Sequence, residues 1–225
     1  MNSLNHEIVW LSKGTPSTLT YKGKEYKSGI AKNQVSELNV TLNGIIGDDV
    51  ENHEFHGGSE RVICVYAYEH YGFWGQLYQH ILPKAAFGEN LTLKGMTESD
   101  VNIGDIYQIG EAIVQVSQGR FPCSTINKYT NIPTLLNKII EHGYTGYFFR
   151  VLEEGTIYSN SSIKLLEKHP KGLSISTIHH TFFHDKENIR QIEAILSLDT
   201  LSKEWKNRLN KLHNSITKNS DKSLR

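Results

Sequence analysis

The first two thirds of the chain alternate short β-prone runs with turn residues. The runs are rich in Val, Ile, Thr and Tyr, whereas glycine, asparagine and charged residues separate them. Lys22-Gly23 and Gly110-Glu111 lie between pairs of runs and predict two tight hairpins, and Glu154-Gly155 predicts a third. The predicted strands are 8–11, 18–21, 25–30, 36–42, 61–66, 91–93, 106–109, 112–117, 147–152 and 156–158.

Two segments between these strands have the spacing of helices. Tyr71, Trp74 and Tyr78 lie on one face of a predicted helix over 68–78. A second helix is expected over 134–142, because Gly143 follows it where a helix end favours a positive φ. Many short strands with few helices favour a closed, mainly β architecture, a barrel or a sandwich with helices at its periphery.

The pattern becomes helical after the linker His169-Pro170-Lys171-Gly172. Three short amphipathic segments are expected over 174–184, 188–198 and 202–216, with Ser174, Asp185 and Ser202 as their N-caps. The sequence therefore predicts two domains, a β-barrel domain over 1–168 and a small three-helix bundle over 169–225. The polar residues 217–225 are expected to be a frayed tail.

Charge and hydropathy narrow the classes of partner. Among 225 residues, 24 are Lys or Arg and 24 are Asp or Glu, so the overall charge does not favour nucleic acid or an anionic membrane. We find no apolar run of the roughly 18 residues that span a bilayer, and the N-terminus does not resemble a signal peptide. We expect a cytoplasmic protein that binds neither nucleic acid nor a membrane.

The first group that could carry chemistry surrounds paired glycines. His56-Gly57-Gly58 precedes Arg61, so backbone amides could approach a ligand while the guanidinium binds phosphate or carboxylate. A tight turn with a surface ion pair explains the same pattern, and His53 with His56 could also form a metal pair.

Two further fragments carry polar residues in apolar surroundings. Glu89 and Asn90 need hydrogen-bond partners or a ligand if they are buried, although a turn before a strand is an equal explanation. The stretch 102–105 ends in Asp105 and is expected to be a structural, Asp-capped turn.

The two cysteines differ in their surroundings. Cys64 lies between Ile63 and Val65 and is expected to be a small buried side chain, and both thiols are expected to be reduced. Cys123 follows Arg120 and Pro122 after a strand, and a nearby positive charge would favour its thiolate. Such a thiolate could be a nucleophile, a soft metal ligand or a carrier of sulfur as a persulfide.

Six motifs occur in a fixed order along the chain. They are Gly47-Asp48, His56-Gly57-Gly58-Ser59-Glu60-Arg61, the stretch 68–74, Phe87-Gly88-Glu89-Asn90-Leu91, Ile103-Gly104-Asp105 and Ser117-Gln118-Gly119-Arg120-Phe121-Pro122-Cys123. Together they resemble the MOSC domain, most closely its YiiM-like bacterial branch. The resemblance covers about residues 25–166, and the three helical segments resemble the small α domain of that branch.

The resemblance implies a β-barrel that binds the molybdenum cofactor, in which the dithiolene of molybdopterin holds the metal. The cysteine at the position of Cys123 is then the protein's ligand to molybdenum, and the expected activity is the reduction of N-hydroxylated compounds such as hydroxylaminopurines and amidoximes. His56 joins Cys123 as a catalytic candidate for proton delivery. The expected cofactor-binding residues are Gly57, Gly58, Arg61, Glu89, Asn90, Gln118, Arg120 and Asn127.

The resemblance leaves an electron donor and one departure to be explained. We find no dinucleotide motif and no cysteine cluster, so a separate flavin or iron–sulfur protein is expected to supply electrons. The C-terminal helices are a candidate surface for that donor or for a homodimer, although a structural cap also fits.

The branch usually has proline where this chain has Gly119, which predicts a looser loop before Arg120. The alternative function is a sulfur carrier or cofactor-handling protein with a persulfide on Cys123, and a cysteine hydrolase is more distant.

Overall fold

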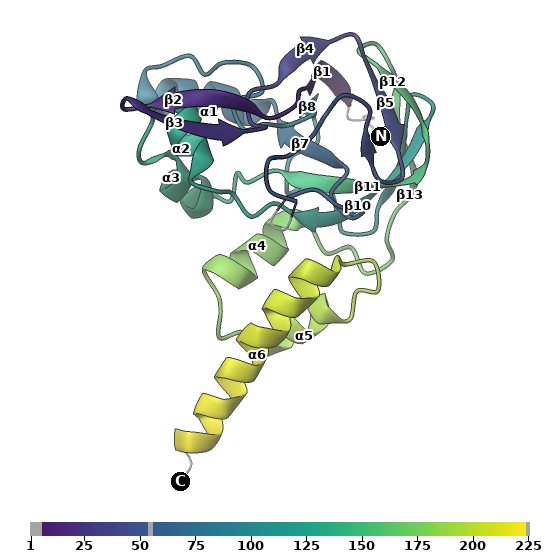
Figure 1. The fold of residues 1–225 in the computed structure, drawn as a ribbon. Helices are drawn as coiled ribbons and strands as arrows, with labels where there is room; N and C mark the ends of the chain where they lie inside the picture. Colours follow the sequence, from purple (N-terminus) through teal and green to yellow (C-terminus); the bar gives the residue numbers. More distant parts are fainter. Residues whose placement is uncertain (1–5, 54–55, 224–225) are drawn as a thin grey trace.

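The computed structural model describes residues 6–53 and 56–223; three of its helices lie between strands along the chain, and the other three follow the last strand (Figure 1). The strands are β1 (Glu7–Lys13), β2 (Ser17–Tyr21), β3 (Lys24–Ser28), β4 (Asn33–Val35), β5 (Glu37–Thr41), β6 (Gly44–Ile45), β7 (Ile63–Ala67), β8 (Leu91–Lys94), β9 (Ile106–Ile109), β10 (Ala112–Gly119), β11 (Tyr147–Glu153), β12 (Gly155–Tyr158) and β13 (Ile163–Glu167). The helices are α1 (Glu69–Tyr78), α2 (Thr125–Thr130), α3 (Leu135–His142), α4 (Ile175–Phe183), α5 (Ile189–Leu196) and α6 (Lys203–Ser223).

One large sheet forms most of the barrel. Its eight strands follow the order β13-β9-β10-β11-β7-β8-β1-β4 and curl into a half-barrel, which the small sheet β12-β5-β6 faces (Figure 1). The hairpin β2–β3 extends from the barrel beside α2. Lys22 and Gly23 at its turn both have positive φ, as the predicted tight turn requires. The mainly β fold with peripheral helices is therefore confirmed.

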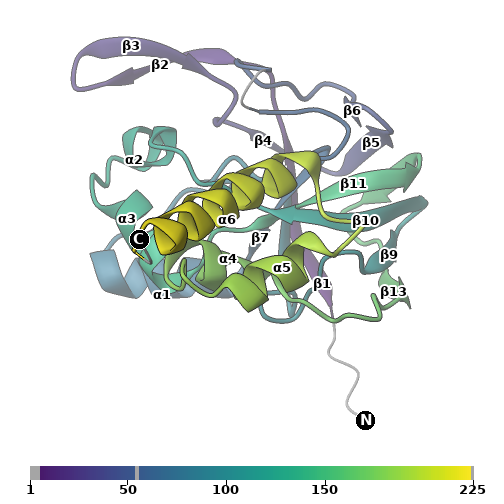
Figure 2. The same ribbon diagram turned by 90° about the horizontal axis from the view of Figure 1, so that it is seen from below.

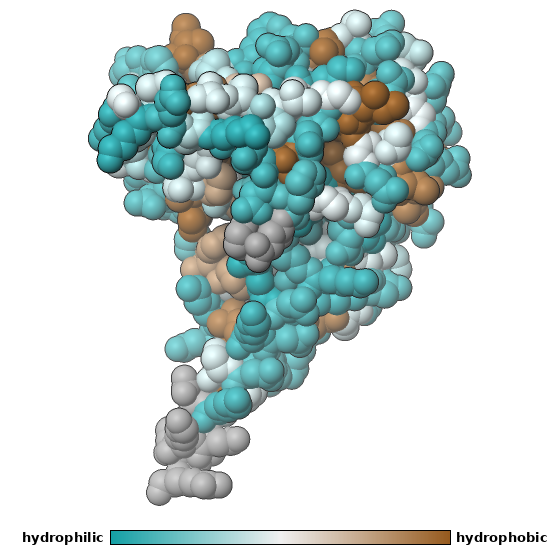
Figure 3. All heavy atoms as spheres, viewed as in Figure 1, coloured by the Kyte–Doolittle hydropathy of each residue, from teal (hydrophilic) through white to brown (hydrophobic). Residues whose placement is uncertain are grey.

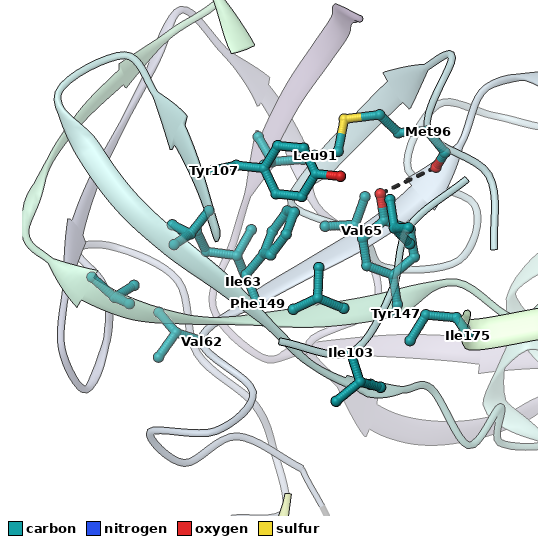
Figure 4. Close-up of a cluster of buried hydrophobic side chains, with 14 of the residues drawn as sticks. Val62, Ile63, Val65, Leu91, Met96, Ile103, Tyr107, Tyr147, Phe149 and Ile175 are labelled. Carbon is teal, nitrogen blue, oxygen red and sulfur yellow. Dashed lines mark hydrogen bonds between the residues drawn. The ribbon is translucent and has the colours of Figure 1, made fainter. Parts of the chain in front are cut away.

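Apolar side chains from neighbouring strands of the large sheet fill the barrel interior. Ile63 and Val65 of β7 are fully buried against Leu91 of β8 and Phe149 of β11 (Figure 4). Tyr147 brings a hydroxyl into this layer, and the hydroxyl donates to the Met96 carbonyl at 3.1 Å. Its burial is thus compensated by a hydrogen bond.

The C-terminal helices pack against one end of this barrel and lie in front of β7, β10 and β11 in Figure 2. Ser174 and Ser202 cap α4 and α6 as predicted, because their hydroxyls accept from Thr177 N–H at 3.1 Å and Trp205 N–H at 3.2 Å. Asp185 was the wrong cap for the middle helix: Asn188 precedes α5 and accepts from Gln191 N–H.

Two other expectations are corrected by the strand pairing and by the last helix. Strands β11 and β12 do not form a hairpin, since β11 pairs with β10 and β7 while β12 pairs with β5 in the other sheet. The chain crosses between sheets at Gly155, where a Cβ would lie 2.6 Å from the Glu111 carbonyl carbon. The helix α6 continues to Ser223, so a frayed tail does not begin at 217.

The surface differs between the two parts of the molecule. Figure 3 shows apolar residues gathered on the barrel side of this face, whereas the helical part below it is mainly hydrophilic. The exposed large apolar side chains of the described chain include Leu42, Ile46, Leu152 and Tyr158. No helix among the described residues is long and apolar enough to cross a membrane.

Candidate functional site

Cys123 lies in the loop that joins β10 to α2, called here the Cys123 loop (residues 120–124). Its side chain is half-buried, and the chain turns into α2 two residues later. Burial raises the pKa of the thiol, but hydrogen bonds from His56 and Thr125 and the charge of Arg120 outweigh burial and lower the pKa to about 6. Cys123 is therefore a thiolate at neutral pH, the form that binds metals.

His56 reaches this thiol from a separate segment, the His56 loop (residues 56–61). Gly57 and Gly58 both have positive φ, with values of 80° and 91°, so the backbone folds tightly before Arg61. The Arg61 Nε closes the turn by donating to the Gly57 carbonyl at 2.7 Å. The two loops meet at the hydrogen bond between His56 and Cys123, although 67 positions of sequence separate those residues.

Arg120, whose charge acts on the thiol, has unused hydrogen-bonding capacity. The Arg120 guanidinium lies close enough to Cys123, Cys64 and Glu89 for their charges to raise its pKa, against the effect of burial. Its Nη1 is nevertheless buried without a partner among the described residues, and so is Oε1 of the buried Gln118. Orphaned buried polar atoms are rare in native proteins, and they indicate a missing partner such as a ligand or water.

Glu89 is fully buried behind this cation and is satisfied by the protein. Its carboxylate accepts from the Tyr71 hydroxyl at 2.5 Å, the Thr92 hydroxyl at 2.8 Å and the Phe87 N–H at 3.2 Å. Burial and the neighbouring Glu89 charge raise the pKa of Tyr71 well above its usual range. The oxygens of Glu89 therefore already have partners, and Glu89 contributes to raising the pKa of Arg120.

Asn90 ties strands together. Its Oδ1 accepts from Cys64 N–H at 3.0 Å, and its Nδ2 donates to the Ser12 carbonyl at 3.2 Å and to Asp48 at 3.0 Å. Asp48 in turn forms a buried ion pair with Lys32. Asn90 thus joins β7 to β1 and to the segment after β6, and this explains its burial without a ligand.

Two other predicted cofactor contacts are occupied within the protein. The Asn127 amide donates to the Pro133 carbonyl at 2.7 Å and accepts from Leu136 N–H at 2.7 Å, so it fixes the connection between α2 and α3. Arg61 donates through Nη1 to Glu204 of α6 at 2.7 Å. A role for Asn127 in cofactor binding has no support in this arrangement, and the charge of Arg61 is already balanced.

The expectation that Gly119 loosens the Cys123 loop is wrong. Gly119 is buried at the end of β10, opposite Tyr147, and its carbonyl accepts from the Trp205 indole at 2.7 Å. A Cβ at this position would lie 2.2 Å from Nε2 of His179, so the histidine ring occupies the space that any larger residue needs. Glycine is present because α4 packs here, and the strand end is held firmly.

The structure accounts for the remaining predicted features by burial, hydrogen bonds or ion pairs. Cys64 is buried in β7, where burial raises the pKa of its thiol. Asp105 caps its turn by accepting from Asn102 N–H at 3.0 Å. His53 pairs with Asp49 at 3.2 Å, and within residues 6–53 and 56–223 no group of three His, Cys, Asp or Glu side chains could hold a metal. Glu54 and Phe55 of the same motif lie outside the described residues.

Sequence reasoning missed the residues that surround the site from other elements. Thr125, which bonds to the thiol, was overlooked although it lies two positions from Cys123. His179, Glu204 and Trp205 contact the site from the C-terminal helices. Their amphipathic pattern predicted burial, but nothing in it predicted which loops they meet.

Comparison with known proteins identifies the family. The MOSC domain model matches residues 52–164, half of the chain, and the model of the YiiM-like 3-alpha helix domain matches residues 173–212. The chain belongs to the MOSC-domain family. It contains both parts of the YiiM-like arrangement, with the site loops in the MOSC part and α4 to α6 in the helical part.

Individual relatives extend this result over most of the chain. The uncharacterized protein YflK of Bacillus subtilis is 39% identical over 92% of this chain and 94% of its own, and YiiM of Escherichia coli is 34% identical over 79% and 81%. A protein named Reductase from Gibberella moniliformis is 34% identical over 66% of this chain, which covers 28% of the fungal protein. The crystal structure of YiiM from Geobacillus stearothermophilus has a TM-score of 0.79 at 35% identity, covering 92% of this chain and 99% of that chain.

Proposed function

We propose that this MOSC protein binds the molybdenum cofactor with Cys123 as the metal ligand and acts as an oxidoreductase on N-hydroxylated compounds. One observation carries the proposal: a thiolate with a pKa of about 6 lies beside Arg120, whose buried Nη1 has no partner among the described residues. A soft sulfur ligand next to an unsatisfied cation suits a metal that is held by an anionic, sulfur-containing cofactor.

The described residues fit such a group. Cys123 would supply the protein's bond to the metal. The orphaned Arg120 Nη1 would donate to the phosphate or to an oxygen of the pterin, and the orphaned Gln118 Oε1 would accept from an N–H of the pterin. Gly57 and Gly58 keep side chains out of the adjoining turn, so their backbone could approach the cofactor closely. When bound, the cofactor would supply a redox-active metal that can accept oxygen from an N-hydroxyl group.

His56 is the proposed proton donor. The His56 side chain forms a hydrogen bond to Cys123, and the residue is exposed to solvent. It could therefore pass protons from solvent to the site while staying beside the proposed metal ligand. Reducing an N-hydroxyl group to an amine consumes two electrons and two protons and releases water. His56 lies where it could deliver one of these protons.

The electrons would come from a separate flavin or iron–sulfur protein. The chain has two cysteines, and the proposal assigns one of them to molybdenum, so the other cannot hold a four-cysteine cluster. The fungal relative named Reductase supports redox chemistry for this family segment. A homodimer is an additional proposal for the assembly.

The reaction is tested with protein produced in a host that makes the cofactor. We expect the protein, 6-hydroxylaminopurine and a chemical reductant to yield adenine, detected by chromatography. Cys123→Ser should abolish the product, whereas Cys64→Ala removes the other, buried thiol and should retain it. Loaded wild-type protein that forms no adenine would remove this substrate from the proposal.

The sulfur-carrier alternative predicts a different product. In that case the wild type would contain no pterin or molybdenum but would release thiocyanate on treatment with cyanide, because a persulfide on Cys123 is cyanolysable. Cys123→Ser would lose this sulfur. That result would replace the oxidoreductase proposal.

A further inference from the structure

The start of α6 bonds to the His56 loop and to the end of β10, which leads into the Cys123 loop. Four consecutive residues take part. Ser202 N–H donates to the Ser117 carbonyl at 3.1 Å, Lys203 N–H donates to the Glu60 carboxylate at 3.0 Å, the Glu204 carboxylate accepts from Arg61 at 2.7 Å, and the Trp205 indole donates to the Gly119 carbonyl at 2.7 Å. Two of these contacts reach the His56 loop, and two reach the end of β10 just before the Cys123 loop. One helical turn therefore sets the spacing between the segments that carry His56 and Cys123.

The Cys123 loop is also held by a side chain. Phe121 stacks on the Trp205 ring with centroids 4.4 Å apart, and the Arg208 guanidinium lies 4.0 Å from the Phe121 ring centre. Pro122 has no N–H, and neither Phe121 nor Pro122 forms a backbone–backbone hydrogen bond among the described residues. The loop conformation between Arg120 and Cys123 is thus supported by the aromatic contact of Phe121 with α6 and by its edge-on contacts with Phe182 and Phe183 of α4.

Glu204 joins the two sets of contacts. Its Oε2 accepts from Arg61 of the His56 loop, and its Oε1 accepts from Arg208 at 2.9 Å, the residue that packs on Phe121. The Glu204 side chain is 27% exposed and that of Arg61 17%, so the pair is partly shielded from solvent. Removing this carboxylate would take away the acceptor that Arg61 of the His56 loop shares with Arg208, the residue of α6 that packs on Phe121.

We propose that Glu204 and Trp205 are positioning residues that hold the His56 loop and the Cys123 loop in register, so that the three-helix domain is part of the site and is more than a structural cap. This inference concerns the protein's own contacts and holds whichever chemistry Cys123 performs. It is independent of whether the protein binds molybdenum.

The test measures how fast iodoacetamide alkylates Cys123 in metal-free protein. Glu204→Gln should lower the rate at pH 6 about threefold or more, because loss of the His56 contact removes most of the thiolate and the greater nucleophilicity of the less acidic thiol restores only part of the rate. At pH 9 the rate should not fall, which shows that the reagent still reaches the sulfur. Hydrogen exchange of residues 56–61 and 120–124 should increase in the same variant.

The matched control is Glu193→Gln on α5. Glu193 pairs with His213 at 3.2 Å within the helical domain and forms no bond to either loop among the described residues, so this variant should match the wild type at both pH values. Equal rates at pH 6 for Glu204→Gln and Glu193→Gln would overturn the proposal.

Trp205→Phe provides a second variant if Glu204→Gln does not fold. It keeps an aromatic ring against Phe121 and removes the indole N–H that bonds to Gly119. A lower rate at pH 6 with an unchanged rate at pH 9 supports the positioning role, and unchanged rates at both overturn it. Absence of molybdenum from the loaded protein would contradict only the proposed function, since no metal enters this test.

Discussion

The two cysteines show how environment decides the chemistry of one residue type. Cys64 is enclosed in β7, and burial raises the pKa of its thiol. Cys123 is half-buried in the loop just before α2, where His56, Thr125 and Arg120 favour the charged form. The acidic thiol is the product of two loops and one helix, so it exists only in the folded protein.

The pH dependence of Cys123 alkylation follows from this environment. We expect the rate to rise with a midpoint near pH 6 in the wild type, since the thiolate is the reactive form and its pKa is about 6. His56→Ala removes the largest stabilising contact, so the midpoint should move upward. The rate is followed by mass spectrometry, and Cys64 in the same protein is the internal control that should stay unmodified. A wild-type midpoint above pH 8 would contradict the described geometry.

The packing of α4 against the end of β10 explains why position 119 is a glycine. We expect Gly119→Ala to lower the free energy of unfolding by about 1–3 kcal/mol, because the new Cβ overlaps the His179 ring and overpacking strains a buried site. Urea denaturation measures this change. The control Gly44→Ala has open space around its Cβ and should change stability by less than about 0.5 kcal/mol.

The double variant identifies the cause. If the histidine ring is responsible, adding His179→Ala should recover part of the loss, so the two changes would not be additive. Additive losses would show that Gly119 is required for another reason.

His179 also makes the packing of α4 sensitive to acid. Burial lowers its pKa from 6.5 to about 4, against the opposing effects of Glu98 and a backbone hydrogen bond at Arg120. Below pH 6.5 this histidine therefore binds a proton in the unfolded chain but not in the folded protein. The free energy of unfolding consequently decreases as the pH falls from 6.5 towards 4. Between pH 7 and pH 5 this group should cost about 2 kcal/mol of unfolding free energy.

The variant His179→Gln isolates this contribution. Its unfolding free energy, measured in urea at pH 7 and pH 5, should fall less between the two pH values than that of the wild type. An equal fall in both proteins would show that other groups cause the acid sensitivity.

The sequence predicted elements better than the contacts between them. Periodicity and turn residues located the hairpin around Gly110 because those signals are local, and β9 and β10 do pair across it. The expected hairpin around Gly155 was wrong because strand partners are chosen by the whole barrel, and β12 joins β5. The motifs brought His56 and Cys123 together correctly, whereas Asn127 and the tight packing of Gly119 depend on neighbours that spacing does not reveal.

At the scale of the molecule, the barrel and the helices share one apolar core. Ile175, Ile195, Trp205 and Leu209 of the helical part belong to the same buried cluster as Val116 of β10. The two parts were predicted as separate domains from the change of pattern near residue 169. Because the core is continuous, each part buries apolar side chains of the other.

Unfolding should therefore be a single cooperative transition. We expect far-ultraviolet circular dichroism and tryptophan fluorescence to give coincident urea curves, because separating the helices would expose the shared apolar surface of both parts. Two resolved transitions would show that the domains are stable independently.

The central claim is that Cys123 holds molybdenum, and the most direct test is the metal and pterin content of protein purified from a host that makes the cofactor. We predict near-stoichiometric molybdenum and releasable pterin in the wild type and in Cys64→Ala, and loss of both in Cys123→Ser. Equal molybdenum and pterin in Cys123→Ser and in the wild type would contradict the claim.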